Sequence, residues 1–147
     1  MLEVFTDEHF MRKAVEQAEM AAEQGEVPVG AVIVCNNMII AKAFNQVETL
    51  NDITAHAEIL AITAASNYLS SKYLDDCTMY VTLEPCPMCA GAIKWSRIQR
   101  LVYGASDDKG GFMRFGKSML HPQSKLEYGI MHDECAGLMK SFFLERR

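Results

Sequence analysis

The chain has 147 residues and a formal net charge of −5 at pH 7, and 50% of its residues are hydrophobic, so we expect one domain with a single core over residues 1–147. The acidic balance does not by itself indicate a nucleic-acid partner, although the basic residues within 94–100, 109–117 and 146–147 could form a local patch. No apolar run approaches the roughly 20 residues of a membrane span, and the N-terminus lacks a signal-peptide pattern, so we expect no membrane association and a cytoplasmic location.

The first half of the chain predicts a helix, a β-hairpin and a second helix. In chain order these elements cover residues 7–22, 29–34, 38–44 and 55–67. Thr6 can cap the first helix by accepting a hydrogen bond from its first turn, and Thr54 can do the same for the second helix. Asn36 and Asn37 suit the tight turn of the hairpin, and the polar residues 45–54 predict a loop.

The second half predicts three more strands and two more helices. In chain order these are strand 78–83, helix 87–96, strand 98–103, strand 126–131 and helix 133–147. Pro87 suits the first position of its helix, with Cys86 directly before it. Residues 105–123 are glycine-rich and irregular, which is typical of a surface segment that carries function. The mixture of helices and strands predicts a three-layer α/β fold.

A histidine, a glutamate and two cysteines form the most informative pattern of the chain. His56-Ala57-Glu58 is followed, after a predicted strand, by Pro85-Cys86-Pro87-Met88-Cys89. One imidazole and two thiolates supply three zinc ligands, the number found in catalytic sites that keep a fourth position open for water. Glu58 can carry protons between that water and a substrate. Because this order and spacing match the signature of zinc-dependent base deaminases, we expect zinc on His56, Cys86 and Cys89 and deamination with Glu58 as the catalytic acid–base.

Each of these residues has a simpler interpretation when it is taken alone. His56 could be a hydrogen-bonded core histidine, and Glu58 could be a carboxylate favoured at a helix N-terminus. Cys86 and Cys89 could be a redox pair or part of a structural metal site. A structural zinc usually has four protein ligands, and no other histidine lies near these motifs in the sequence. The two motifs together therefore favour a catalytic metal.

The segments around these residues resemble the bacterial tRNA-specific adenosine deaminases, which belong to the cytidine/deoxycytidylate deaminase superfamily. The resemblance is carried by residues 26–32, 52–59 and 80–92, and it resumes at 133–136 and 142–143. It implies a cytidine-deaminase-like α/β/α fold with a central mixed sheet of about five strands. It also implies conversion of the wobble adenosine of tRNA to inosine, by a homodimer that binds the anticodon loop and holds one Zn²⁺ per subunit.

The resemblance further implies which side chains contact the substrate. The Asn45 amide matches one that contacts the target nucleoside, and it offers both a donor and an acceptor. Phe142 and Phe143 match an aromatic pair that can stack on bases, although one of them could equally anchor its helix in the core. Arg146 and Arg147 match basic residues that can pair with phosphate. The substrate contacts expected in this way are Val29, Asn45, Ala57, Asp107, Phe142 and Phe143.

The chain departs from the family pattern over residues 110–118 and at Leu144, where the family has arginine. The aromatic and basic residues of the divergent segment could form a replacement surface for RNA or could be local packing. These residues are Phe112, Arg114, Phe115 and Lys117. The departure leaves a second function open, deamination of a free base or nucleoside, with guanine as the leading candidate. A third hypothesis is a non-catalytic zinc site in a binding module, and the presence of Glu58 argues against it.

Overall fold

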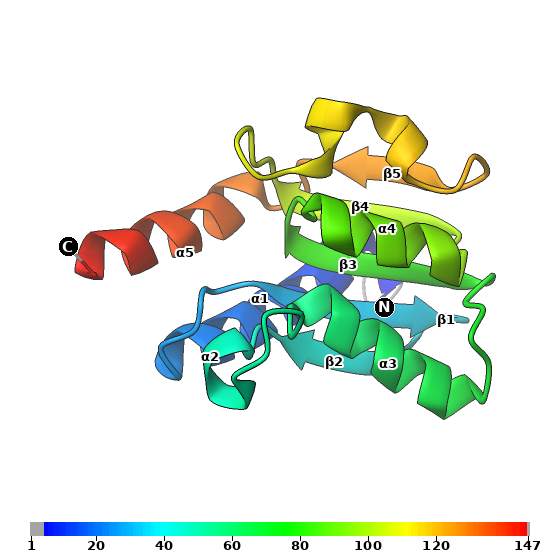
Figure 1. The fold of residues 1–147 in the computed structure, drawn as a ribbon, viewed down its shortest axis with the longest axis horizontal. Helices are drawn as coiled ribbons and strands as arrows, with labels where there is room; N and C mark the ends of the chain where they lie inside the picture. The colour runs from blue at the N-terminus through cyan, green and yellow to red at the C-terminus, as the bar shows by residue number, and fades with distance from the viewer. Residues whose placement is uncertain (1–4, 147) are drawn as a thin grey trace.

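The computed structural model describes residues 5–146 and has a five-stranded mixed sheet between two layers of helices (Figure 1). The strands are β1 (Gly30–Cys35), β2 (Met38–Phe44), β3 (Cys77–Leu83), β4 (Arg100–Ala105) and β5 (Lys125–Tyr128). Their spatial order is β2-β1-β3-β4-β5. β1 pairs antiparallel with β2 and β3, whereas β4 is parallel to both β3 and β5. The expected cytidine-deaminase-like α/β/α fold with about five strands is confirmed.

The helices of the described residues cover the two faces of the sheet. They are α1 (Asp7–Glu23), the short α2 (Val47–Leu50), α3 (Ala57–Leu69), α4 (Pro87–Ser96) and α5 (His132–Glu145). α3 and α4 lie on one face, and α1 and α5 lie on the other (Figure 1). No helix among residues 5–146 is long and apolar enough to cross a membrane.

The interior strand β1 is apolar on both faces because a helix layer covers each of them. Ala31 and Ile33 point into the core under α3 and α4, where small alanines of α3 allow close approach. Val32 and Val34 point the other way, into the core under α1. Gly30 lets the backbone of α1 approach β1, since a Cβ there would lie 2.2 Å from the carbonyl oxygen of Ala14.

α5 differs from the other long helices because only its first half packs on the sheet. Cys135 and Phe142 are its buried residues, and its C-terminal half projects past the sheet edge (red in Figure 1). The prediction that this helix runs from 133 to 147 is close to the observed bounds, although Arg147 lies outside the described residues.

The prediction that Thr54 caps the helix predicted over 55–67, which is α3, is wrong. The Asp52 carboxylate accepts hydrogen bonds from the backbone N–H and the hydroxyl of Thr54, at 2.8 and 2.7 Å, so Thr54 belongs to a turn that precedes the helix. His56 has extended backbone dihedrals and is the N-cap, and the helix begins at Ala57. The loop predicted over 45–54 also contains α2, and the last strand is β5 rather than residues 126–131.

Candidate active site

Three potential metal ligands come together where two helices begin. His56 and Cys86 are the N-cap residues of α3 and α4, and Cys89 lies one turn into α4. Neither N-cap side chain is used to cap its own helix, so the imidazole and the thiol point toward each other instead. His56 Nδ1 lies 3.7 Å from Cys86 Sγ and 3.4 Å from Cys89 Sγ, and the three donor atoms all lie within 4.8 Å of one another.

This geometry fits a tetrahedral zinc ion. A zinc about 2.05 Å from a nitrogen and about 2.3 Å from a sulfur places those two atoms about 3.6 Å apart. The two nitrogen–sulfur distances in the group, 3.4 and 3.7 Å, fall on either side of that value. Imidazole and thiolate are the donors that zinc prefers. Among residues 5–146 the group contains these three donors, which leaves a fourth tetrahedral position for water or substrate.

A hydrogen bond between the two thiols moves their pKa values in opposite directions. A hydrogen bond from Cys89 lowers the pKa of Cys86 to about 4, whereas the same hydrogen bond and burial raise the pKa of Cys89. A hydrogen bond to Cys86 likewise raises the pKa of His56. The N-termini of α3 and α4 add positive potential at this point, which favours thiolate. The group therefore has the electrostatic character of a site for a divalent cation.

Glu58 lies beside these donors in the first turn of α3. Its side chain is buried, with 4% of its surface exposed, and burial raises its pKa to about 7. It also shares a hydrogen bond with the Cys89 thiol. A carboxyl group with a pKa near neutrality can both accept and donate a proton at physiological pH, as general acid–base catalysis requires.

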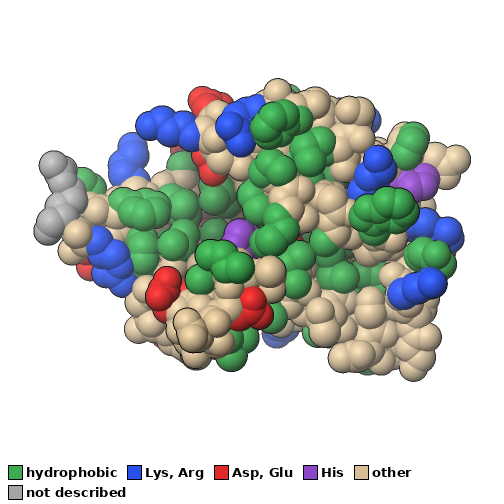
Figure 2. Space-filling model, in the orientation of Figure 1, with side chains coloured by type: hydrophobic (Ala, Val, Ile, Leu, Met, Phe, Trp, Pro, Cys, Tyr) green, Lys and Arg blue, Asp and Glu red, His purple; other side chains and the backbone are tan. Residues whose placement is uncertain are grey.

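A cavity of about 610 Å³ opens over the group and is bounded by both helix layers. In Figure 2 it is the hollow in which one histidine is visible, surrounded by hydrophobic side chains. His56, Glu58 and Cys86 lie at its floor. Met139 and Phe142 of α5, and the exposed Arg146 that follows α5, line its outer end. The predicted substrate contacts that line the cavity are Val29, Asn45, Ala57, Asp107 and Phe142.

The two phenylalanines of α5 occupy different environments. Phe142 is buried, with 7% exposed, and the Arg146 guanidinium lies 4.0 Å from the centroid of its ring. Phe143 is 53% exposed and packs edge-on against Phe142 at 5.2 Å between centroids. Phe143 is absent from the cavity lining in the described part of the chain, so it supports Phe142 rather than facing the floor.

Asn45 is tethered to the backbone on both sides of its amide. Its Nδ2 donates to the carbonyl oxygen of Val27 at 3.3 Å, and its Oδ1 accepts from the N–H of Val47 at 3.3 Å. A carboxamide has two N–H groups and two acceptor positions. One donor and one acceptor of Asn45 therefore remain for a ligand in the cavity, and the tethers fix their direction.

Two buried carboxylates in the cavity lining were not anticipated from the sequence. Glu26 is 1% exposed and accepts from the N–H groups of Glu48 and Thr49, at 3.1 and 2.7 Å. Glu84 is 6% exposed and is likewise held by backbone N–H groups of a distant loop. The sequence does contain a signal for them, because each of the two acidic residues stands in an apolar segment close to a proline. A carboxylate that is buried with such a segment needs hydrogen-bond partners. Other lining residues without a sequence signal are Val47, Ile53, Leu83, Gly110 and Met139.

The divergent segment 110–118 is partly core and partly surface. Phe112 is fully buried and packs edge-on against Tyr103 at 6.2 Å, so for this residue the structure supports local packing, one of the two alternatives left open by the sequence. The aromatic ring supplies core volume at the start of a 3-10 turn, Phe112–Phe115. Phe115 is 60% exposed, and the Arg114 guanidinium lies 4.8 Å from the centroid of its ring.

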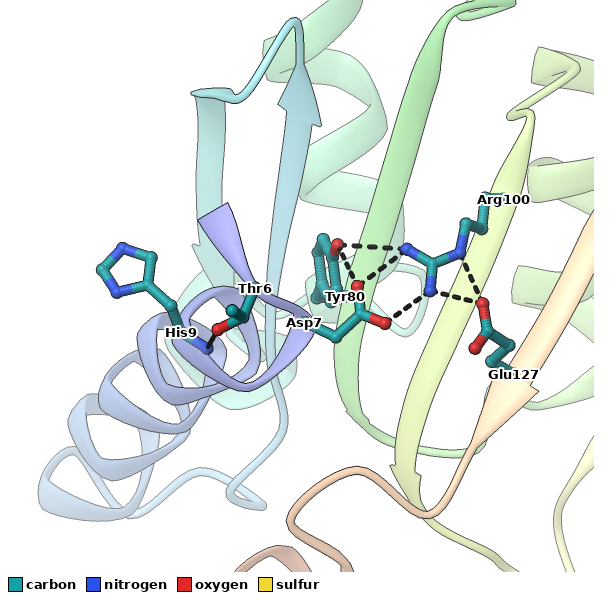
Figure 3. Close-up of polar contacts among 6 residues, drawn as sticks. All are labelled: Thr6, Asp7, His9, Tyr80, Arg100 and Glu127. Carbon is teal, nitrogen blue, oxygen red and sulfur yellow. Dashed lines mark hydrogen bonds and ion pairs between the residues drawn. The ribbon is translucent and has the colours of Figure 1, made fainter. Parts of the chain in front are cut away.

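The basic residues at 94–100 are largely engaged in ion pairs. Arg100 donates to Asp7 at 2.8 Å and to Glu127 at 2.7 Å, and Tyr80 donates its hydroxyl to the same Asp7 carboxylate (Figure 3). The Arg100 hydrogen bond lowers the pKa of Asp7, and the cluster joins α1 to β3, β4 and β5. Arg97 forms a bidentate pair with an aspartate on the surface. This stretch therefore offers little net positive charge.

Comparisons with known proteins agree with this site. Residues 5–147 match the MafB19-like deaminase family. The chain is 44% identical over 146 residues to a tRNA-specific adenosine deaminase of Bacillus subtilis (strain 168), covering 96% of this chain and 91% of that protein. A solved structure from studies of A-to-I editing by tRNA:A34 deaminases superposes with a TM-score of 0.83 at 43% identity, covering 88% and 98% of the two chains. A guanine deaminase of Bacillus subtilis is 46% identical with a TM-score of 0.63, but it covers 66% of this chain and 62% of its own.

Proposed function

Because the chain belongs to the MafB19-like deaminase family and is 44% identical to a tRNA-specific adenosine deaminase, we propose that it hydrolytically deaminates the wobble adenosine of a tRNA to inosine. The observation that carries this proposal is the arrangement of the cavity. A His-Cys-Cys group and a buried glutamate lie at its floor, and an aromatic residue and an arginine lie at its outer end. A single purine would fill only the inner part, so the outer part is available for neighbouring nucleotides.

We assign one zinc ion per subunit to His56, Cys86 and Cys89. The nitrogen–sulfur distances and the donor types support this assignment. Zinc bound there would supply the Lewis acidity that makes water a nucleophile near neutral pH. The remaining steps fall to side chains of the chain itself.

Glu58 is the proposed proton carrier. It accepts a proton from the attacking water and delivers it to a nitrogen of the purine ring, while the water oxygen bonds to C6. It then carries the second water proton to the amino group, the C6–N bond breaks, and ammonia leaves. The sum is adenosine plus water giving inosine plus ammonia. A pKa of about 7 suits a group that must accept and release protons in one cycle.

The base is proposed to lie between the apolar residues Val29 and Ala57. The spare donor and acceptor of Asn45 would hydrogen-bond to the target nucleoside, since its other positions are already occupied. Farther out, Asp107 would contact the adjoining nucleotide and Phe142 would stack on a neighbouring base. Extruding the target base from the anticodon loop requires such replacement contacts, because stacking in the RNA is lost.

Cationic residues near the cavity are the proposed phosphate contacts. Arg146 lines the outer end, and its guanidinium is already oriented by the Phe142 ring. The exposed pair Arg114 and Phe115 offers a second cation and an aromatic face. RNA binding is therefore assigned to the segment 109–117 and the end of α5, and not to residues 94–100.

Deamination of free guanine is the second candidate function. The 46% identity to a guanine deaminase over 66% of this chain is the observation that favours it. The outer part of the cavity argues for the larger substrate, since a free base has no groups to place beside Phe142 and Arg146.

We also propose that the chain is one cytoplasmic deaminase domain that forms a homodimer. Met88 and Trp95 lie seven residues apart on α4 and are 41% and 79% exposed. Residues at this spacing share one helix face. Ile53, in the loop before α3, is also 78% exposed. Large exposed apolar side chains that share a face are typical of a protein–protein interface.

The proposal is tested with an anticodon stem-loop that carries adenosine at the wobble position. The zinc-loaded protein is incubated with this RNA, and the digested nucleosides are analysed by mass spectrometry. We expect inosine from this stem-loop and no uridine from a matched stem-loop with wobble cytidine. Absence of inosine, with ammonia released from free guanine by the same preparation, would reject the tRNA substrate in favour of the second candidate.

A further inference from the structure

One wall of the cavity is a loop whose two ends are held by a single carboxylate. Glu84 Oε1 accepts a hydrogen bond from the N–H of Asp107 at 3.0 Å, and Oε2 accepts one from the N–H of Met113 at 3.0 Å. With 6% of its surface exposed, the side chain is shielded from water that could replace these bonds. Glu84 therefore closes the loop 107–113 from inside the fold.

The same segment of backbone joins this loop to the metal-binding turn. The N–H of Glu84 donates to the carbonyl oxygen of Ala105 at 2.8 Å, and the N–H of Phe112 donates to the carbonyl oxygen of Pro85 at 2.9 Å. Cys86 follows Pro85 directly. The position of Asp107 relative to Cys86 is thus determined through two consecutive residues, Glu84 and Pro85.

Gly111 shows how closely the loop is fitted around this carboxylate. A Cβ at position 111 would lie 2.0 Å from Glu84 Oε2, so even an alanine would displace the carboxylate or the loop. Asp107 adds a local constraint, because its Oδ1 accepts from the N–H groups of Lys109 and Gly110, at 3.2 and 3.0 Å. Gly110 and Asp107 themselves line the cavity.

We infer that Glu84 is a positioning residue for deamination, which acts through Asp107 and the loop 107–113 and sets the affinity for nucleotides beside the target base. Both of its oxygens are occupied by backbone N–H groups, so its role is exerted on the loop and not on the reacting atoms. This inference rests on the proposed tRNA function for the identity of the ligand. The two hydrogen bonds that Glu84 accepts from the N–H groups of Asp107 and Met113, called the clamp below, are present in the free protein.

The first test is Glu84→Gln, which keeps the shape of the side chain but turns one acceptor into a donor that faces a backbone N–H. We expect KM for the wobble-adenosine stem-loop to rise about tenfold, kcat to change less than about threefold, and zinc content to stay at the wild-type level. An unchanged KM, or a fall in kcat alone, would overturn the inference.

A double-mutant cycle separates the clamp from a general loss of stability. If Glu84 acts through Asp107, then Glu84→Gln combined with Asp107→Asn should raise KM little more than the larger single effect. Glu26→Gln is the matched control, because Glu26 is also a buried carboxylate in the cavity lining, and it holds the backbone of a different segment, at Glu48 and Thr49. The fold increases in KM caused by Glu26→Gln and by Asp107→Asn should multiply in the double mutant, as for independent sites. If the fold increases in KM caused by Glu84→Gln and Asp107→Asn also multiplied, this would contradict the inference that Glu84 acts through Asp107.

Hydrogen exchange of the free protein tests the clamp without any substrate. Amides of residues 107–113 should exchange at least about tenfold faster in Glu84→Gln than in wild type, while amides of residues 47–50 keep their rates. Wild-type protection at 107–113 would overturn the clamp even if the enzyme edits tRNA. A wild-type enzyme that makes no inosine would reject the proposed function, and the exchange result would still decide the clamp.

Gly111→Ala provides a second variant that leaves the carboxylate in place and disturbs the same contact from the loop side. Should Glu84→Gln fail to fold, the same rise in KM and the same faster exchange are expected from Gly111→Ala. Wild-type values of both quantities in a folded Gly111→Ala protein would contradict the inference.

Discussion

His56 Nδ1 lies 3.4 Å from Cys89 Sγ, although 33 residues separate the two in the sequence. The contact exists because α3 and α4 begin at the same point of the fold, with His56 and Cys86 as their N-cap residues. The two sequence motifs are thereby joined into one group of three donors. Each proposed role at the floor of the cavity depends on this convergence.

Loss of either cysteine should remove the metal. We expect Cys86→Ala and Cys89→Ala to contain less than about a tenth of the zinc found in wild type, because two remaining ligands bind zinc far more weakly than three. Elemental analysis of the purified proteins measures this directly. Cys135→Ala is the control, since Cys135 is a buried residue of α5 on the other face of the sheet and its loss should leave the zinc content unchanged. Full retention of zinc in Cys86→Ala would refute the ligand assignment.

Glu58→Gln should separate metal binding from catalysis. The amide keeps the size of the side chain but cannot carry a proton, so kcat is expected to fall by at least about 100-fold with zinc content unchanged. Single-turnover formation of inosine, together with elemental analysis, checks both parts. Equal turnover by Glu58→Gln and wild type would support the non-catalytic zinc site instead.

Arg146 should contribute to RNA affinity through phosphate. Replacing it with alanine is expected to weaken stem-loop binding and to reduce the slope of log K against log salt by about 1, as for the loss of one phosphate contact. Fluorescence anisotropy over a series of salt concentrations gives this slope. Arg12 is the matched control, because it is an exposed arginine on α1 that pairs with Glu8, and Arg12→Ala should leave the slope unaltered. An unchanged slope for Arg146→Ala would place the phosphates elsewhere.

The Asp7–Arg100 pair should make stability depend on pH in the acid range. Because its hydrogen bond with Arg100 lowers the pKa of Asp7 in the folded protein, the pair stabilises the fold above the unfolded pKa, which is about 3.9, and this contribution is lost as the pH falls through the lower folded pKa. Asp7→Asn should lower the free energy of unfolding at pH 7 by roughly 1 kcal/mol, the upper range for ion pairs near the surface.

Urea unfolding at a series of pH values tests this prediction. The difference between wild type and Asp7→Asn should be constant from pH 7 to about pH 5 and should shrink as the pH falls further. Asp108→Asn is the control, since Asp108 is exposed in a loop and should show no such difference. A difference that grows as the pH falls would contradict the assigned direction.

The sequence predicted the floor of the cavity well because local signals determine it. Residue types and spacing identified His56, Glu58, Cys86 and Cys89, and Pro87 with the preceding Cys86 predicted the start of α4. The apolar run before Asn36 and Asn37, with these two turn residues, predicted the hairpin, and the observed bounds of β2 match the predicted ones.

The walls of the cavity could not be predicted in the same way, because they depend on contacts between distant segments. Glu26 meets Thr49 across 23 residues, and Glu84 meets Met113 across 29. Thr54 offered a good N-cap by residue type, but a nearer carboxylate on Asp52 takes its hydrogen bonds. The burial of Phe112 follows from the space beside Tyr103, which no local pattern records.

Deamination of the wobble adenosine of tRNA is tested most directly by comparing two values of kcat/KM for the zinc-loaded enzyme, one for a wobble-adenosine stem-loop and one for free guanine. If the outer cavity binds the nucleotides around the target base, the stem-loop should be preferred by at least about 100-fold, because remote contacts contribute to transition-state binding. Inosine should appear at the wobble position in that experiment. A higher kcat/KM for guanine, with no inosine in the stem-loop, would show that the enzyme acts on a free base and not on tRNA.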